Sequence, residues 1–257
     1  MSDRSPPGQA PGQAPGRVDY FASDVHLAAE RPEVAQLFLR FCDHVVRRDA
    51  ARFFLLGDIF DLWVGSKQER MPYVVPFLDK MREIVADGIE VFYIAGNRDF
   101  NFDASFAPGI PPKPLPESLT IEAAGKRIYL THGDLLCTGD VAYGRARTIL
   151  RSGPLRAAAN HLPLSFTTFM STGYRRLSER ETARKTRLEV AVNFGRVRTH
   201  LLADHDIVMS GHVHRAARYQ VDLPDGRSGE FITLGEWNRR GSYLEARDGV
   251  LSLRRFV

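Results

Sequence analysis

The chain has 257 residues, of which 44% are hydrophobic and 26% are charged, and this composition is typical of a soluble globular protein. It contains no apolar run long enough to cross a membrane, and its N-terminus lacks the hydrophobic stretch of a secretory signal peptide. Cys42 and Cys137 are too few for a disulfide framework, so we expect free thiols in a reducing compartment. We therefore expect a cytoplasmic protein, and the net charge of +4 adds only a mild bias toward anionic partners.

Residues 1–17 are rich in Pro, Gly and Gln and carry no apolar pattern, so we predict a disordered tail. After this tail, apolar strand-like runs alternate with segments of helical hydrophobic spacing. The expected elements are a strand from Val18, a helix over Pro32–Arg48, a strand over Arg52–Leu56, a helix over Val74–Ala86 and a strand over Glu90–Ala95. This alternation predicts α/β layering with a largely parallel sheet in this half of the chain.

The second half of the chain is less regular. A Pro-rich connector is expected over Ala107–Glu117, and residues 141–203 are helical in texture and rich in Arg, so we interpret them as an insertion. Strands are expected over Leu119–Glu122, Lys126–Leu130 and Asp206–Met209, with short alternating strands over Tyr219–Val257 and turns at Ala124-Gly125, Asp225-Gly226 and Asp248-Gly249. Together these elements predict one domain over residues 18–257 that the insertion interrupts.

Side chains that can bind metal follow the ends of several predicted strands. They are Asp24, His26, Asp58, Asn97, His132, His212 and His214. Because ligands of open α/β sheets bind beyond the carboxyl ends of the strands, we expect these loops to converge on one site. The Asp-x-His and His-x-His spacings would place both side chains on the same side of an extended segment. Any one of these motifs is more often a turn or a core feature, so the prediction rests on their joint occurrence.

The chemistry of this set favours a transition metal. Asp and Asn supply oxygen ligands and His supplies nitrogen, a mixture that suits Mn, Fe or Zn. The set is too large for one ion with an open position, so we predict two divalent ions about 3.5–4 Å apart that share Asp58 as a bridge. Such a pair generates a hydroxide near neutral pH and neutralises the oxygens of a phosphate ester, which predicts a phosphoesterase.

The ordered motifs resemble the calcineurin-like metallophosphoesterase superfamily. The chain carries its D-x-H, GD, GN followed by Arg and Asp, H and GHxH elements between Val18 and His214. Within that superfamily, the segments around these motifs and the late LGEW segment are similar to the enzymes that cleave the pyrophosphate of UDP-2,3-diacylglucosamine in lipid A synthesis. The resemblance implies a four-layer αββα sandwich with a helical lid over about residues 141–203. It implies two metal sites, with manganese the expected metal, one formed by Asp24, His26, Asp58 and His214 and one by Asp58, Asn97, His132 and His212.

Beyond the metals, we expect Asn97 and Arg98 to be catalytic. The residues expected to contact substrate are Asn97, Arg98, Asp140, Lys185 and His212. Many superfamily members have a His at the position of Arg98 that can protonate a leaving alkoxide, whereas an Arg cannot release a proton at working pH. Arg98 can instead stabilise phosphate charge in a fixed fork, which suits a phosphate leaving group and hence a pyrophosphate substrate. The alternative is that Arg98 is a solvated loop residue.

Other acidic residues near the motifs have two interpretations each. Asp61 and Asp99 either orient metal-binding imidazoles or form a local salt bridge or cap. Asp140 matches a family element that contacts the sugar, and the alternative is a cap on a helix that begins near Val141.

The insertion carries apolar residues at helical spacing, from Phe166 to Leu177, interleaved with arginines. This pattern fits an ordinary amphipathic helical pair packed on the core. It also fits a lid whose apolar inner face holds acyl chains and whose basic outer face docks on anionic lipid, and the resemblance favours this second interpretation. Lys185 lies near the position of a substrate-contacting Lys in the family.

The resemblance thus implies hydrolysis of UDP-2,3-diacylglucosamine to 2,3-diacylglucosamine 1-phosphate and UMP by a metal-bridged hydroxide. The expected partners are this UDP-linked sugar and, through the basic lid, the cytoplasmic face of the inner membrane, with no nucleic acid expected. One alternative is a metallophosphoesterase of another specificity, such as a phosphodiesterase or nuclease. The other is a non-catalytic scaffold, but such proteins lose ligands and this chain has every expected one.

Overall fold

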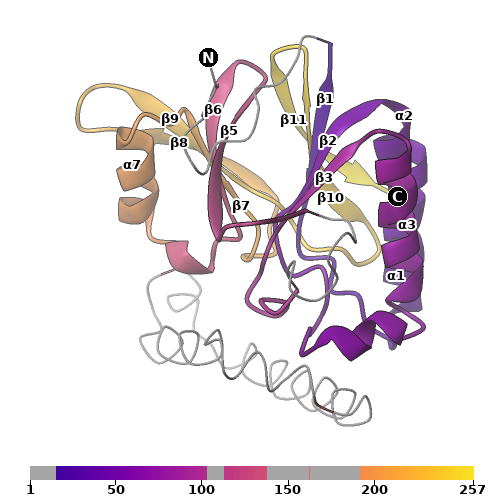
Figure 1. The fold of residues 1–257 in the computed structure, drawn as a ribbon. Helices are drawn as coiled ribbons and strands as arrows, with labels where there is room; N and C mark the ends of the chain where they lie inside the picture. Colours follow the sequence, from indigo (N-terminus) through magenta and orange to yellow (C-terminus); the bar gives the residue numbers. More distant parts are fainter. Residues whose placement is uncertain (1–15, 103–112, 138–161, 163–191) are drawn as a thin grey trace, which may run out of the picture.

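The computed structural model describes residues 16–102, 113–137, 162 and 192–257. Within these ranges the chain forms two β-sheets that pack against each other, with helices on their outer sides (Figure 1). Most of the predicted tail, most of the predicted connector and most of the predicted lid lie outside the described residues. Asp140 and Lys185 are among the residues outside, so their expected contacts stay predictions.

The first sheet has six strands in the order β11-β10-β1-β2-β3-β4. Four of them run parallel: β1 (Val18–Ala22), β2 (Ala50–Leu55), β3 (Glu90–Ile94) and β4 (Lys113–Leu115). An antiparallel hairpin of β10 (Gly241–Arg247) and β11 (Val250–Phe256) completes the sheet beside β1. The prediction of a parallel α/β arrangement for the N-terminal half is confirmed.

The helices of this half cover the outer face of the first sheet (Figure 1). They are α1 (Pro32–Phe41), a π-helical turn (Cys42–Val46), α2 (Arg47–Asp49) and α3 (Val75–Ala86), and a 3₁₀ turn (Ser66–Arg70) precedes α3. Pro32 starts α1 because its fixed φ and missing N–H suit the first helical turn. The apolar side chains of α1, among them Leu37 and Phe41, recur at helical spacing and are buried against the sheet.

The second sheet has five strands in the order β5-β6-β7-β9-β8. They are β5 (Ser118–Ala123), β6 (Lys126–Thr131), β7 (Ile207–Ser210), β8 (Ala217–Asp222) and β9 (Ser228–Thr233), with β6, β7 and β9 parallel. A short 3₁₀ turn (Asp134–Leu136) follows β6, and α7 (Phe194–Leu202) contacts β7 and β9. Helix α7, which falls at the end of the range assigned to the insertion, therefore packs on the outer face of this sheet (Figure 1).

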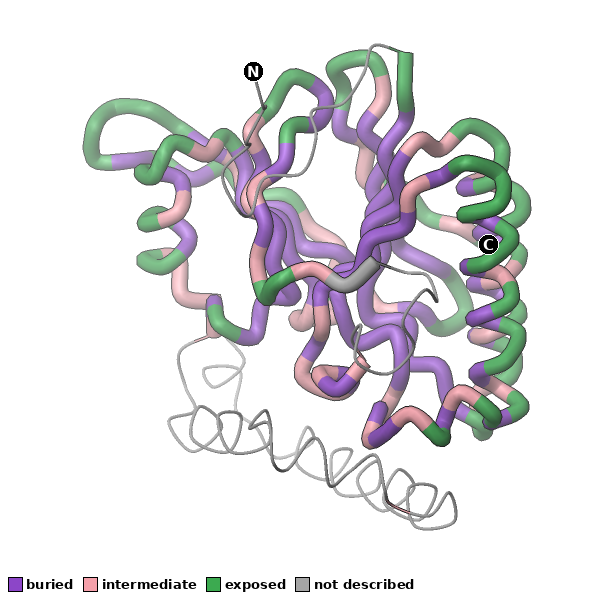
Figure 2. Tube along the Cα trace, viewed as in Figure 1, coloured by how far each residue is buried: buried purple, intermediate pink, exposed green. Residues whose placement is uncertain are grey.

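Strand side chains alternate between separate hydrophobic cores, and this alternation defines the layers. In β2, Phe53 packs into the core beneath α1 and α3, whereas Phe54 packs into the core between the sheets. In β7, Met209 joins the core between the sheets and Val208 packs beneath α7. Figure 2 shows the buried strands running through the centre and exposed positions on the helix surfaces and turns. Cores on both sides of each sheet require helix, sheet, sheet and helix layers, so the αββα prediction is confirmed.

One prediction in the second half is wrong. Part of the expected Pro-rich connector is strand β4, which pairs with β3 through Phe92 and Lys113. A proline is tolerated there because β4 is the edge strand, where Pro114 need not donate to a further strand. The predicted turns at 124–125 and 248–249 are confirmed, since each pair has positive φ between two antiparallel strands. In the part of the chain that the structure describes, no helix is long and apolar enough to cross a membrane.

Candidate metal centre

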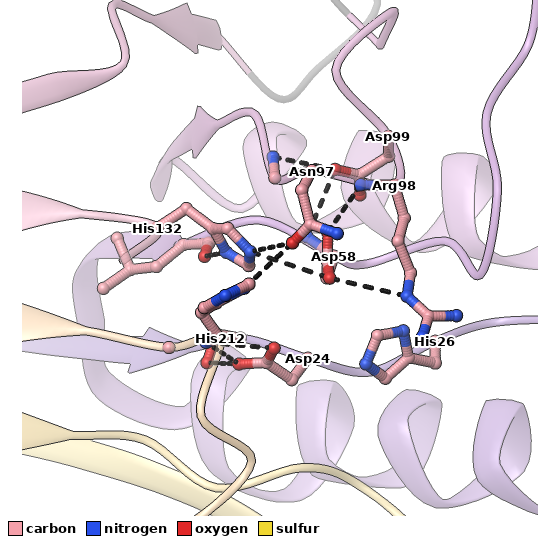
Figure 3. A network of polar contacts seen from close by, with 12 residues as sticks. Asp24, His26, Asp58, Asn97, Arg98, Asp99, His132 and His212 are labelled. Carbon is pink, nitrogen blue, oxygen red and sulfur yellow. Dashed lines mark hydrogen bonds and ion pairs between the residues drawn. The ribbon is translucent and has the colours of Figure 1, made fainter. Parts of the chain in front are cut away.

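The loops that follow β1, β2, β3, β6 and β7 meet where the carboxyl ends of the two sheets come together (Figure 3). These loops come from both sheets: those after β1, β2 and β3 from the first, and those after β6 and β7 from the second. Backbone hydrogen bonds tie neighbouring loops: the N–H groups of Asp24 and His26 donate to the carbonyls of Gly57 and Asp58, each at 3.0 Å. Across the other sheet, the N–H of Gly211 donates to the carbonyl of His132 at 2.9 Å.

One group of side chains gathers Asp24, His26, Asp58 and His214, whose candidate ligand atoms all lie within 4.8 Å of one another. The Nε2 atoms of His26 and His214 are 3.2 Å apart, and Nε2 of His214 is 3.5 Å from Oδ1 of Asp24. Asp24 is completely buried, and its carboxylate also accepts hydrogen bonds from its neighbour Ser23 and from the backbone N–H of His212.

A second group gathers Asp58, His132 and His212, again within 4.8 Å. Oδ1 of Asn97 lies 2.9 Å from Nε2 of His132 and 2.9 Å from Nδ1 of His212, so this amide oxygen joins the same cluster (Figure 3). Asp58 belongs to both groups, which is the position that a bridging carboxylate requires.

The tautomer of His132 is set from outside the cluster. Its Nδ1 lies 2.8 Å from the carbonyl oxygen of Leu56, which can only accept, so Nδ1 keeps its hydrogen, and Nε2 faces the cluster and offers a lone pair once the imidazolium has lost its proton. Burial lowers the pKa of His132, but the charges of Asp58 and Asp24 outweigh it and raise the pKa to about 9. Burial raises the pKa of Asp58. Both groups would shed protons more readily beside a cation.

Five residues of the cluster have a left-handed backbone conformation. Asp24, His26, Asp58, His212 and His214 all have positive φ, at 53°, 54°, 52°, 68° and 56°. The two-residue spacing of the D-x-H and H-x-H motifs therefore does not act through an extended segment, and that part of the sequence reasoning is wrong. Left-handed residues each cost of the order of 1–2 kcal/mol and collect at functional sites, where the surrounding structure holds them.

Glycines allow the loops to approach closely. Gly57 has a φ of +80°, and a Cβ at this position would lie 2.6 Å from Nδ1 of His132 and 2.6 Å from Cα of Gly96. A side chain here would push apart the loops after β2, β3 and β6, so position 57 requires glycine.

Asp99 has a role that the sequence interpretation missed. It is buried, and its carboxylate accepts backbone hydrogen bonds from Asp58 (3.1 Å), Ile59 (2.7 Å), Phe60 (3.2 Å) and Gly96 (2.9 Å). These four bonds go to backbone donors and not to an imidazole, so Asp99 locks the loop after β2 to the loop after β3. The expected alternatives included a local cap, and the observed clamp spans two loops.

Arg98 is held at the edge of the cluster. Its backbone N–H donates to Oδ1 of Asp58 at 2.9 Å, and its Nε is 3.8 Å from Oδ2 of the same carboxylate. Its Nη1 donates to Oδ1 of Asp61 at 2.6 Å, and that same oxygen is 3.8 Å from Nδ1 of His26. The side chain of Arg98 is only 16% exposed, which argues against a freely solvated loop residue.

The donor set fits divalent metal ions. Carboxylate oxygen and imidazole nitrogen converge in both groups, a mixture of ligands that suits Mn, Fe or Zn. The Nε2 atoms of His26 and His214 face each other at 3.2 Å. Buried nitrogens arranged in this way are satisfied by a cation between them more readily than by each other.

Comparisons with known proteins agree with this geometry. The model of the calcineurin-like phosphoesterase family matches residues 20–216. A UDP-2,3-diacylglucosamine hydrolase of Pseudomonas aeruginosa is 33% identical over 227 residues, which cover 88% of this chain and 93% of that protein. The enzyme of the same name from Aeromonas hydrophila is 34% identical over 231 residues, which cover 89% of this chain and 94% of that protein.

Among solved structures, a dimetal phosphatase from Danio rerio aligns with 95% of this chain and 99% of that chain, with a TM-score of 0.46 and 13% identity. The family model spans most of the chain, and curated relatives at 33–34% identity are covered over nearly their whole length. This chain belongs to the calcineurin-like phosphoesterase family.

Proposed function

We propose that this chain is a metal-dependent hydrolase that splits the pyrophosphate of UDP-2,3-diacylglucosamine into UMP and 2,3-diacylglucosamine 1-phosphate, a step of lipid A biosynthesis. The observation that carries the proposal is the convergence of two candidate ligand groups on Asp58. The relatives named for this reaction, at 33–34% identity over most of the chain, support the choice of substrate.

In this proposal the two groups of side chains hold two divalent ions, with manganese the expected metal. One ion is held by Asp24, His26, Asp58 and His214, and the other by Asp58, Asn97, His132 and His212. Two such ions, when bound, lower the pKa of a water and neutralise the charge of phosphate oxygens.

Arg98 supports a pyrophosphate rather than an alkyl ester as substrate. Its guanidinium keeps its charge at working pH and offers several donors, so it can stabilise a leaving phosphate but cannot protonate an alkoxide. Asp61 accepts a hydrogen bond from Nη1 of Arg98 at 2.6 Å, which keeps the guanidinium near Asp58 and hence beside the proposed metals. Asn97 and His212 are proposed to contact the same phosphate group.

The remaining parts of the proposal concern the lipid. Asp140 and Lys185 are proposed to contact the substrate from the segment 138–191, and the Arg-rich lid is proposed to dock on the cytoplasmic face of the inner membrane. The interleaved apolar and basic residues of that segment support this proposal. Sedimentation with vesicles tests it: binding to phosphatidylglycerol but not to phosphatidylcholine is expected, and equal binding to both would contradict it.

The decisive experiment is turnover of purified UDP-2,3-diacylglucosamine by the full chain, with mass analysis of both products. Chelator-treated protein should be inactive and should recover with added Mn²⁺, and release of both UMP and the lipid 1-phosphate is expected. Asp58→Asn should abolish activity, while Asp79→Asn, on the exposed face of α3, serves as the matched control. Full activity after metal removal would refute the proposal, and cleavage of single-stranded DNA instead of this substrate would favour the nuclease alternative.

A further inference from the structure

Glu236, to which the sequence interpretation gave no role, lies against His214. Its Oε2 is 3.2 Å from Nδ1 of His214. We infer that Glu236 is a positioning residue: it fixes the imidazole of His214 so that Nε2 faces Asp24 and His26, and it thereby sets the affinity of that group for a divalent cation. The inference rests on the proposed metal site and extends it by one residue.

The geometry around the imidazole gives its orientation. Because a carboxylate only accepts, the hydrogen of His214 is on Nδ1, and Nε2 is left with a lone pair. That Nε2 lies 3.5 Å from Oδ1 of Asp24 and 3.2 Å from Nε2 of His26. Carboxylates that hold the far nitrogen of a ligating imidazole are known to orient the ring and raise its basicity.

Glu236 is itself held in place. Its backbone N–H donates to the carbonyl of His214 at 3.4 Å, and Nδ2 of Asn238 donates to its Oε1 at 3.4 Å. The next residue, Trp237, donates its backbone N–H to the carbonyl of Asp24 at 3.0 Å. The centroid of its buried ring lies 5.0 Å from that of Phe38. The backbone that carries Glu236 is therefore fixed relative to both the cluster and the core beneath α1.

The two histidines of this group differ in what holds them. The side chain of His26 is only 4% exposed, so packing restricts its ring. The side chain of His214 is 35% exposed, so packing alone leaves its ring more freedom. A hydrogen bond to Glu236 supplies the restriction that burial does not. Loss of this hydrogen bond should therefore lower the cation affinity of the group that contains His214 and leave the affinity of the group with His132 and His212 unchanged.

The test is Mn²⁺ binding to the metal-stripped full chain, measured by titration calorimetry. The wild-type protein should bind two ions, and in Glu236→Ala the affinity of one site should fall roughly 10–100-fold while the other keeps its value. Glu236→Gln should recover most of the loss, because its amide oxygen can accept the same Nδ1–H. Glu230→Ala, which removes an ion pair with Arg218 at the edge strand β8, is the matched control and should bind as wild type.

The outcomes separate this inference from the proposed function. If the wild-type chain does not bind two Mn²⁺ ions, both the proposed function and the positioning role of Glu236 are overturned. A wild-type chain that binds two ions, with Glu236→Ala binding both equally well, would overturn the positioning role alone. A Gln variant as weak as the Ala variant would also overturn it, since orientation by the hydrogen bond would then not be the cause. Unfolding of the metal-free variants should match wild type, because Glu236 is 39% exposed.

Discussion

Replacing Asp99 tests whether one buried carboxylate holds the two central loops of the site together. Its Oδ1 accepts from the N–H groups of Asp58 and Gly96, and its Oδ2 accepts from those of Ile59 and Phe60. In Asp99→Asn, one oxygen becomes an NH₂ group that faces two N–H donors. Whichever way the amide is oriented, two buried backbone donors lose their acceptor.

The magnitude follows from the cost of stranding these donors. Each buried donor left without a partner costs about 1–3 kcal/mol, so Asp99→Asn should lower the free energy of unfolding by about 2–6 kcal/mol. Removing the charge of Asp99 also relieves its repulsion with Asp58, which acts in the opposite direction. This relief cannot replace the missing acceptors, so a net loss of stability is expected. Asp99→Ala strands all the donors and should cost more.

The assay is urea unfolding of the metal-free chain, followed by Mn²⁺ titration of whichever variants remain folded. Asp79→Asn is the control, because it removes a carboxylate that is 57% exposed and forms an ion pair with Arg82. It should unfold as wild type does, since exposed pairs contribute little. A loss below about 1 kcal/mol in Asp99→Asn, with unchanged Mn²⁺ affinity, would refute the clamp.

Three further predictions follow from named contacts. Arg98→Ala should lower kcat on the pyrophosphate substrate by about 10²–10³-fold, as loss of a charge-stabilising donor does, while calorimetry shows both Mn²⁺ ions still bound. In chelator, unfolding midpoints should fall as pH rises from 6.5 to 9: the pKa of His132 is raised from 6.5 to about 9 in the fold, so its contribution is complete below 6.5 and is lost by 9. His132→Gln should flatten that slope, and a midpoint that rises with pH would contradict the assignment. Gly57→Ala should destabilise more than Gly88→Ala in urea, because both have positive φ but only Gly57 has atoms within 4 Å of the added Cβ.

Much of the fold could be predicted because each half of the chain repeats a local pattern. Buried runs such as Phe53–Leu56 end at a glycine and a polar residue, and that boundary marks the strand end without any knowledge of the partner strand. The residues that meet at the site could be listed for the same reason, since Asp58 and Asn97 each follow such a run. The catalytic and substrate-contacting roles of these residues remain predictions.

Other features could not be predicted because they depend on contacts distant in sequence. Periodicity indicates strands but not their partners, so the division of the site loops between two sheets was not visible. Strand β4 was missed because Pro114 is acceptable only at an edge, and the edge is defined by the whole sheet. Asp99 accepts from residues some 40 positions away, and Glu236 contacts His214 from another strand end. Neither contact could be predicted from the residues next to it in the sequence.

The left-handed backbone at the site helps to explain why its residues could be recognised from the sequence. Apart from glycine, Asn, Asp and His are the residues that adopt positive φ most often, and Asp and His are also good ligands for divalent cations. At Asp24, His26 and Asp58 one residue type thus satisfies two demands, a left-handed backbone and a ligand atom. A substitution that loses either one is expected to fail: Ala at Asp58 removes the ligand atom, and a β-branched residue removes the ligand atom and also disfavours the left-handed backbone. The D-x-H and GD motifs therefore satisfy a conformational requirement together with a chemical one. The residue types in these motifs predict the site for that reason, whereas the argument from side-chain alternation in an extended segment does not apply.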